Sequence, residues 1–229
     1  MSSLLENTKQ NIFQKLLAKL HKKIVHNHRV AILSQIIYAN ILALNAGNKI
    51  PLKILDVGCG NLKILYSLKD KFPGAEFKGI DVFELPAHFQ DDSYWQYYRS
   101  FNGVNIPFEN DSFDFILLID VLHHIASDKQ LLLLKEVKRV GKVVIIKDHF
   151  EYGFLSRQTL RLMDIAGNWA YGVSIPKSYF SKASFASLMN TVDCNVEKMI
   201  EEIDLYKNLK PLNFFLKPQW QFICIGKFK

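Results

Sequence analysis

The chain has 229 residues and a formal net charge of +7, with 49% hydrophobic and 22% charged residues. The length suits one domain with an N-terminal extension, and the composition is that of a globular protein with ample material for a core. No uninterrupted apolar stretch approaches the roughly 20 residues that cross a bilayer, which excludes a membrane-spanning helix. The positive charge is compatible with RNA or anionic lipid as a partner, but it is also common in proteins that bind neither.

The three cysteines, Cys59, Cys194 and Cys224, are too few and too scattered for a disulfide framework or a zinc site. We therefore expect no disulfides and no metal. The N-terminal segment lacks the apolar core and the small-residue cleavage site of a secretory signal. These features predict a reducing, cytoplasmic setting.

Residues 1–50 are predicted to form a helical extension or lid. The first helix carries apolar residues at three- and four-residue spacing, namely Leu5, Ile12, Phe13, Leu16, Leu17, Leu20 and Ile24. Its other faces carry lysines between Lys9 and Lys23, so this helix could lie on an anionic membrane, contact RNA or cover the core. A second helix, about Arg29–Leu44, is apolar nearly all round and is predicted to be buried.

From Pro51 onward strand patterns alternate with helical patterns, and we assign residues 51–229 to one domain. Seven short apolar or aromatic-rich runs are predicted to be strands, namely Leu52–Val57, Ala75–Asp81, Tyr94–Phe101, Phe113–Ile119, Lys142–Lys147, Cys194–Leu205 and Gln219–Lys227. Helices are predicted at Leu62–Phe72, Lys129–Arg139, Leu155–Ile165 and from the N-cap Ser181 to Met189. Irregular segments or loops are predicted at Phe83–Ser93, Gly167–Tyr179 and Lys207–Pro218. Repeated strand–helix units indicate an α/β fold with a parallel sheet and helices on both faces.

The motif around which the domain is organised is Asp56-Val57-Gly58-Cys59-Gly60, followed about twenty residues later by Gly79-Ile80-Asp81-Val82. Glycine lets the backbone turn sharply off a strand and lets a ligand approach, because it has no Cβ. The next helix offers free N–H groups, and an acid at the next strand end can accept from both hydroxyls of a ribose. The pair predicts a site for an adenosine-containing cofactor, although a bare strand–turn–helix corner would also explain the glycines.

Four segments in this order resemble the class I S-adenosylmethionine-dependent methyltransferases. Leu55–Gly60 is similar to the family's first motif and Gly79–Val82 to its second. Asn102–Phe108, followed by Asp111–Asp114, resembles the acid-x-x-x-Leu-Pro-Phe…Ser-Phe-Asp segment. Val121–His124 is similar to the Leu-His-His that often follows the fourth strand. The resemblance implies a Rossmann-like, doubly wound, mostly parallel seven-stranded sheet with an N-terminal helical extension.

The resemblance also implies S-adenosylmethionine as the cofactor and assigns roles to matching positions. Asp56, Gly58 and Gly60 would surround its methionine part, and Asp81 would hold its ribose. The other cofactor-binding candidates are Cys59, Val82, Asn102, Gly103 and Ile119. The chain departs from the family pattern at three places: Leu62 replaces a third glycine, Asn102 replaces an acid, and Gly141-Lys142 replaces a Pro-Gly-Gly turn.

The methyl acceptor is expected outside the carboxyl ends of the fourth and fifth strands. The catalytic candidates there are His124, His149 and Asp148, since histidine is a natural base for a phenol, enol or amine. The same residues could instead pack, cap a loop or form a hydrogen-bonded pair. The substrate-binding candidates are Asp120, His123, Asp164, Asn168, Tyr171 and Tyr179.

The segment from Lys147 to Pro176 resembles one bacterial subgroup, for which small-molecule and quinone-type methyltransferases are the nearest broad grouping. We therefore expect an enzyme that methylates a small, apolar or amphiphilic metabolite, with a peripheral membrane contact through the basic N-terminal helix as a further expectation. An RNA methyltransferase is the second hypothesis, which the net charge favours. A non-catalytic protein that binds S-adenosylmethionine is the third.

Overall fold

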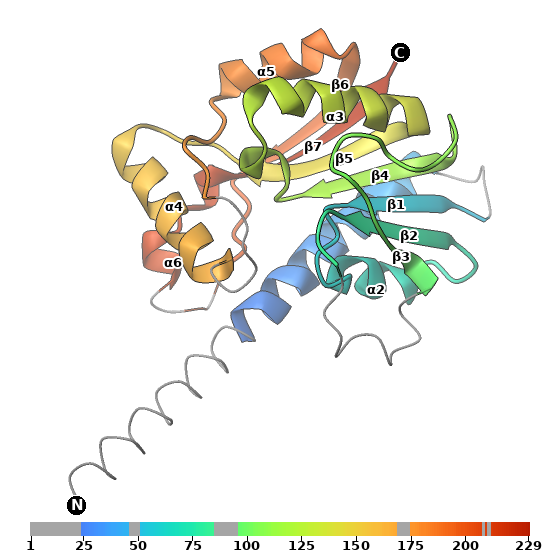
Figure 1. Ribbon diagram of the computed structural model, residues 1–229. Helices are drawn as coiled ribbons and strands as arrows, with labels where there is room; N and C mark the ends of the chain where they lie inside the picture. Colours follow the sequence, from blue (N-terminus) through green and yellow to red (C-terminus); the bar gives the residue numbers. More distant parts are fainter. Residues whose placement is uncertain (1–23, 46–50, 85–95, 169–174, 208, 210–211) are drawn as a thin grey trace, which may run out of the picture.

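The computed structural model describes residues 24–45, 51–84, 96–168, 175–207, 209 and 212–229 (Figure 1). One sheet has the strand order β3-β2-β1-β4-β5-β7-β6. The strands are β1 Lys53–Val57, β2 Glu76–Asp81, β3 Tyr98–Ser100, β4 Phe113–Ile119, β5 Gly141–His149, β6 Cys194–Glu201 and β7 Gln221–Phe228. Strands β1 to β5 pair in parallel, and β7 is antiparallel to both β5 and β6. The predicted α/β fold with a mostly parallel, seven-stranded sheet is confirmed.

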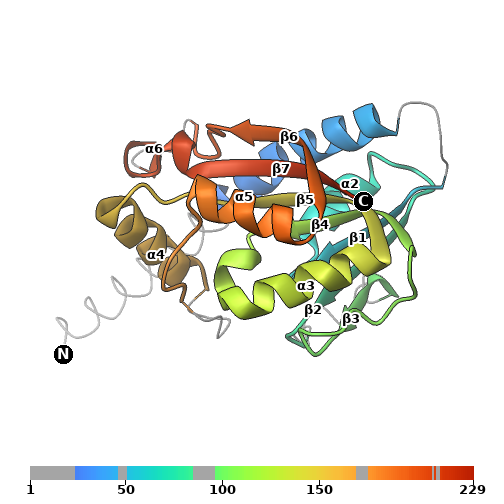
Figure 2. The same cartoon turned by 90° about the horizontal axis from the view of Figure 1, so that it is seen from above.

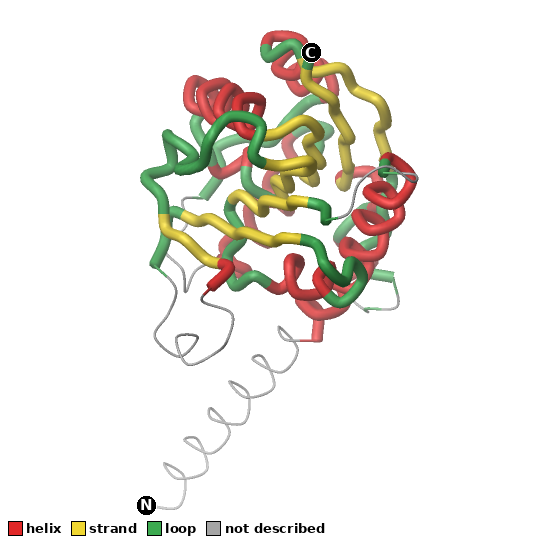
Figure 3. Tube along the Cα trace, turned by 90° about the vertical axis from the view of Figure 1, so that its right-hand side faces the viewer, coloured by secondary structure: helices red, strands yellow, loops and turns green. Residues whose placement is uncertain are grey.

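Helices cover both faces of this sheet (Figure 2, Figure 3). The described helices span residues 24–44, α2 Lys63–Lys69, α3 Ser127–Val140, α4 Phe154–Asn168, α5 Lys182–Thr191 and α6 Leu212–Phe215, with short 3-10 turns at η3 Leu122–His124 and η5 Pro218–Trp220. Helices α3 and α5 pack in one apolar cluster, which includes Leu134 and Phe185. Helix 24–44 and α2 pack in the other, which includes Ile37 and Leu65. The sheet is therefore sandwiched between two cores.

The middle strand β4 shows why its sequence is apolar almost throughout. Ile116 and Leu118 belong to the cluster under α3, whereas Phe115 and Leu117 belong to the cluster under helix 24–44. Successive side chains of a strand point to opposite faces, so a strand between two helix layers needs apolar residues at every position. Helix α5 begins at the predicted N-cap, where the Ser181 side chain accepts from the Ser184 N–H in a capping box.

The second predicted helix differs from expectation in its length and burial. The described helix already begins at residue 24 and ends at residue 44. Leu33, Ile37 and Ile41 are buried, but Leu42 and Leu44 are 53% and 45% exposed. The predicted burial of this helix is therefore confirmed on one side and wrong on the other. It lies on one face of the sheet, so only a single stripe of its residues can reach the core.

Three strand and loop boundaries also differ. Strand β6 ends at Glu201 rather than Leu205, because Glu202 adopts a left-handed backbone conformation with φ of 57°. Strand β5 continues to His149, which places Asp148 and His149 in regular sheet. The segment predicted as a loop after Lys207 contains the short helix α6.

Some predictions fall outside the described residues. These are the basic helix before residue 24, most of Phe83–Ser93, Tyr171 and the side chain of Asn168. Among the helices that the structure does describe, none is long and apolar enough to cross a bilayer.

Candidate active site

The glycine corner after β1 is held tightly on one side and open on the other. Gly58 has φ of 74°, and a Cβ there would lie 2.5 Å from Val121 Cγ2, so only glycine fits. The Gly58 N–H donates to the Ile80 carbonyl at 2.8 Å, which ties the corner to β2. Gly60 has φ of 52°, and a Cβ there would meet no atom within 4 Å. The corner therefore leaves space for a ligand to approach its backbone.

Asp81 ends β2 and completes this corner. Its Oδ2 accepts from the Gly60 N–H at 2.8 Å, and its Oδ1 accepts from the Phe83 N–H at 3.2 Å. The backbone thus fixes the carboxylate in one orientation. Each carboxylate oxygen keeps a free acceptor position, which suits the two hydroxyls of a ribose.

Asn102 and Gly103 form a turn after β3, beside this corner. The Asn102 Oδ1 accepts from the N–H groups of Val104 and Asn105, both at 2.9 Å, so this side chain shapes the turn. Gly103 has φ of 75°, and a Cβ there would lie 3.1 Å from Val82 Cγ1. Val82 is 52% exposed, which leaves an apolar surface at the predicted adenine position.

A cavity of about 260 Å³ connects the glycine corner with the carboxyl ends of β4 and β5. The predicted site residues that line it are Asp56, Gly58, Cys59, Gly60, Ile119, Asp120, His124, His149 and Asp164. Helix 24–44 and α4 close it with side chains that include Arg29, Leu33, Leu160 and Met163. The predicted residues outside this lining are Asp81, Val82, Asn102, Gly103, His123, Asp148 and Tyr179.

Asp56 is a buried carboxyl group in the wall of the cavity. Burial, together with the nearby Asp81, raises the pKa of Asp56 to about 7. At neutral pH this group is therefore poised between its two protonation states. A cation bound in the cavity would favour the ionised form.

Asp120, directly after β4, is held by two cations from distant segments. Its carboxylate forms ion pairs with Lys147 of β5 and Arg29 of helix 24–44. Although burial opposes ionisation, these cations hold the pKa of Asp120 well below its usual range. Asp120 has φ of 58°, and its N–H donates to the Lys147 carbonyl at 2.9 Å. The strained backbone is thus tied to the same lysine as the side chain.

His123 and Asp148 form a second, fully buried pair behind the cavity wall. The His123 Nδ1 lies 2.7 Å from Asp148 Oδ1, and Asp148 also accepts from the His149 N–H at 2.7 Å. Burial opposes both charges, but each partner offsets this effect: the pKa of His123 is raised and that of Asp148 is lowered. The His123 Nε2 lies 3.7 Å from Asp164 Oδ2, to which the Tyr179 hydroxyl donates. The pair thus holds predicted substrate residues in place.

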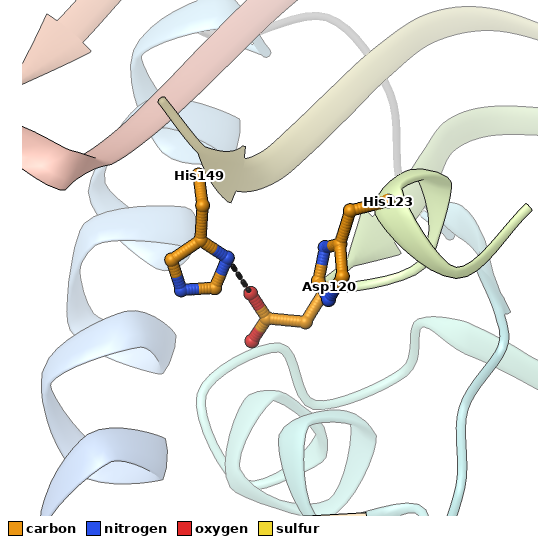
Figure 4. Close-up of side chains that lie close together, drawn as sticks. All are labelled: Asp120, His123 and His149. Atoms are coloured by element: carbon orange, nitrogen blue, oxygen red, sulfur yellow. Dashed lines mark ion pairs between the residues drawn. The ribbon is translucent and has the colours of Figure 1, made fainter. Parts of the chain in front are cut away.

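His149 points from the end of β5 towards Asp120, with His123 on the opposite side (Figure 4). Its Nε2 lies 3.2 Å from Lys147 Nζ, and its Nδ1 lies 3.6 Å from Asp120 Oδ1. Burial and Lys147 lower the pKa of His149 to about 4, so the ring is neutral at physiological pH. Because an ammonium group can only donate, the His149 Nε2 accepts from Lys147, and Nδ1 carries the ring proton.

Asp120, His123 and His149 are also residue types that bind metal ions, and each brings a nitrogen or oxygen atom within 4.8 Å of the others. The electrostatics favour a different role for them. Arg29 and Lys147 already supply the positive charge that an ion would bring to Asp120. The His149 Nδ1 carries a proton in this arrangement, whereas a metal needs a lone pair.

Two cations of this site, Lys147 and Arg29, were missed by sequence analysis. Lys147 had a signal, since it is a charged residue directly after the apolar run Val143–Ile146 of a buried strand. Its side chain is fully buried, which is rare for lysine without a partner. Arg29 had no local signal, because Asp120 is 91 residues away.

Comparison with known proteins agrees with this geometry. Residues 55–143 match a family model described as a methyltransferase domain. Two of the similar solved structures are S-adenosylmethionine-dependent methyltransferases, from Aquifex aeolicus (17% identity, TM-score 0.56, 84% of this chain and 89% of that chain) and Methanosarcina mazei (18%, 0.60, 81% and 96%). A third, from Archaeoglobus fulgidus, has 13% identity and a TM-score of 0.55, and the match covers 85% of this chain and 94% of that chain. No curated protein shows a significant match.

These structures share the fold of this chain, and the family match covers the glycine corner, Asp81 and the ends of β4 and α3. The open face at Gly60, the fixed carboxylate of Asp81 and the buried Asp56 suit a cationic adenosyl cofactor. Residues 55–143 are therefore similar to a methyltransferase domain, and the chain has the fold of solved S-adenosylmethionine-dependent methyltransferases.

Proposed function

We propose that this protein is an S-adenosylmethionine-dependent methyltransferase that acts on a small, apolar or amphiphilic metabolite, in the manner of small-molecule and quinone-type methyltransferases. The observation that carries the proposal is the composition of the cavity beyond the glycine corner. Its lining combines polar groups, among them Arg29, Asp120 and His149, with six apolar side chains, which are Val30, Leu33, Ile64, Ile119, Leu160 and Met163. Such a lining suits an acceptor with one polar group on an apolar body.

The cofactor-binding set in this proposal is Asp56, Gly58, Cys59, Gly60, Asp81, Val82, Asn102, Gly103 and Ile119. When bound, S-adenosylmethionine supplies an electrophilic methyl group on a sulfonium. The protein has to bind the cofactor, aim the acceptor at that methyl group and exclude water. Asp56, opposite the positively charged part of the cofactor, would lose its proton on binding, and helix 24–44 would close the cavity.

His149 is a hydrogen-bond donor in this mechanism rather than a base. Lys147 occupies its Nε2, so the buried Nδ1–H, which faces Asp120 at 3.6 Å, is the donor that it can offer. This donor can orient a lone pair on the acceptor atom. Asp148 acts from behind the wall, because it holds His123 and the backbone of His149 in place.

His124 is the remaining candidate for a general base. It lines the cavity, and its ring centroid lies 4.1 Å from that of the buried His123. Asp120 and Asp164 would line the acceptor side, with Tyr179 and His123 supporting Asp164. General-base catalysis contributes roughly 100-fold or more where it operates.

A methyl-transfer assay with labelled cofactor, against separate lipid, small-metabolite and RNA pools, tests the proposal. We expect label in an apolar or amphiphilic product. Label in RNA, with a binding constant that falls steeply with salt, would favour the RNA alternative. Calorimetric binding of the cofactor without transfer to any pool would favour the non-catalytic alternative. If His124→Ala and His149→Ala both keep full turnover, the roles given to these two histidines are wrong.

A further inference from the structure

The most exposed large apolar side chains that the structure describes all lie on two helices, α4 and α6. They are Phe154, Leu155, Leu162 and Phe214, with exposed fractions of 69%, 81%, 66% and 70%. Ile165 and Phe215 extend this surface, with 36% and 58% exposed. Both helices lie at the same end of the molecule in two perpendicular views (Figure 1, Figure 2). We call these six side chains the α4–α6 face.

Helix α4 has two apolar sides that serve different purposes. At about 100° per residue, Phe154, Leu155, Leu162 and Ile165 fall within an arc of about 100°. Leu160 and Met163 lie on the opposite side of the helix and line the cavity. One helix therefore separates the acceptor end of the cavity from an exposed apolar surface.

The segments that carry this face are basic. Residues 205–220 contain Lys207, Lys210 and Lys217 and no acidic residue. The Lys217 ammonium lies 5.2 Å from the centre of the Phe214 ring. On α4, Arg161 adds a positive charge, whereas Arg157 is paired with Glu151 and the one acid of the helix, Asp164, faces the cavity. An apolar face flanked by lysine and arginine matches an anionic lipid surface in both hydrophobicity and charge.

We propose that the α4–α6 face docks on an anionic membrane surface, from which an amphiphilic acceptor enters the cavity past α4. This inference rests on the proposed function for its substrate class. Phe154, Leu155, Leu162 and Phe214 would insert into the boundary between headgroups and acyl chains. The flanking lysines would contact phosphate groups, and the net charge of +7 would attract the whole chain to the bilayer.

A second copy of the chain is the competing occupant of this face. Self-association would bring two chains of net charge +7 together, which opposes a dimer at low ionic strength. A membrane surface instead complements that charge. The two occupants therefore predict opposite salt dependence.

Cosedimentation with vesicles tests docking without any turnover. The full chain is mixed with vesicles of phosphatidylcholine alone or with added phosphatidylglycerol. We expect binding that is at least tenfold tighter to the anionic vesicles and that weakens as salt screens the charges. Equal binding to both vesicles, or no binding to either, would overturn the proposal, as would a salt-stabilised dimer in light scattering that a change in this face dissolves.

The matched variants separate the face from general surface hydrophobicity. Leu155→Ser combined with Phe214→Ser should lower vesicle affinity by roughly a hundredfold, because two large side chains no longer leave water. Leu132→Ser on α3, where the side chain is 51% exposed, is the control and should leave affinity unchanged. Equal losses in both variants contradict the proposal. Circular dichroism and cofactor calorimetry confirm that each variant is folded.

Activity then distinguishes the two proposals. With an amphiphilic pool presented in vesicles, the face variant should transfer methyl groups more slowly, while cofactor affinity stays unchanged. With the same pool dispersed in detergent, its turnover should match that of the original chain. If vesicles bind through this face but no pool accepts a methyl group, the proposed function fails and the docking surface stands.

Discussion

Two aspartates at the carboxyl edge of one sheet are held by opposite means. Asp81, the last residue of β2, is fixed by two backbone N–H groups from nearby loops. Asp120, after β4, is fixed by the side chains of Lys147 and Arg29. The cofactor end of the cavity is thus organised by backbone and lacks a cation among these contacts, whereas the acceptor end is organised by buried charges.

This difference has a functional consequence. A backbone-held carboxylate keeps free lone pairs for a ligand and leaves its negative charge uncompensated, which suits a cationic cofactor. A carboxylate that is neutralised by two cations contributes rigidity and little net charge, which suits an apolar acceptor. The following changes test that contrast.

The largest effect is expected from Lys147→Met. This change keeps the apolar stem but leaves Asp120 without its fully buried cation, and breaking a buried ion pair costs about 3–5 kcal/mol. Urea unfolding should show that loss. Lys53→Met is the matched control, since Lys53 pairs with Glu76 at 3.8 Å on the surface and should cost at most about 1 kcal/mol. Equal losses for the two variants would refute the contrast.

Asp56→Asn should stabilise the chain without cofactor at pH 8. The folded pKa of Asp56, about 7, lies above the ordinary value of 3.8, so the folded state binds more protons between these values. Its contribution to stability therefore falls as pH rises from about 4 to 7. The amide removes this penalty, worth about 4 kcal/mol above pH 7 and nothing below pH 4.

The same change should weaken cofactor binding, because the cofactor loses an anionic neighbour. Thermal unfolding at pH 4 and pH 8 measures the first effect, and calorimetry in two buffers of different ionisation enthalpy measures the proton release. If the difference in stability between the variant and the original chain is the same at pH 4 and at pH 8, Asp56 has an ordinary pKa.

Asp81→Ala should reduce cofactor affinity by roughly 30- to 150-fold, which corresponds to about 2–3 kcal/mol for hydrogen bonds to a charged group. Calorimetry is the measurement. Asp114→Ala is the control, because the Asp114 carboxylate accepts from the Lys53 N–H at the opposite edge of the sheet. That variant should keep its cofactor affinity, and an unchanged affinity in Asp81→Ala would contradict the assignment of the ribose position.

The same contrast explains what the sequence could predict. The strands, the glycine corner and Asp81 follow from local patterns, because glycine turns and apolar runs act over a few residues. The interval between them is short, so spacing alone brings Gly60 and Asp81 together. The fold class and the cofactor were accessible for this reason.

The acceptor end depends on contacts that no local pattern encodes. Asp120 meets Arg29 across 91 residues, and Tyr179 meets Asp164 across 15. The tautomer of His149 depends on Lys147, which sequence analysis placed at the end of a strand without a role in the site. Sequence analysis gave His149 as a candidate base or as part of a hydrogen-bonded pair, whereas the donor role that we propose depends on its contact with Lys147.

The smallest effect is expected from Arg29→Gln, which removes the second cation of Asp120. Arg29 is 27% exposed at its side chain, whereas Lys147 is fully buried, so water can replace part of the lost interaction. We expect a stability loss of about 1 kcal/mol, well below that of Lys147→Met. High salt should make this stability loss smaller, and urea unfolding at two ionic strengths measures the loss at low and at high salt. If the two losses were equal, burial would not be what distinguishes the two cations, and helix 24–44 would be as essential to the acceptor end as β5.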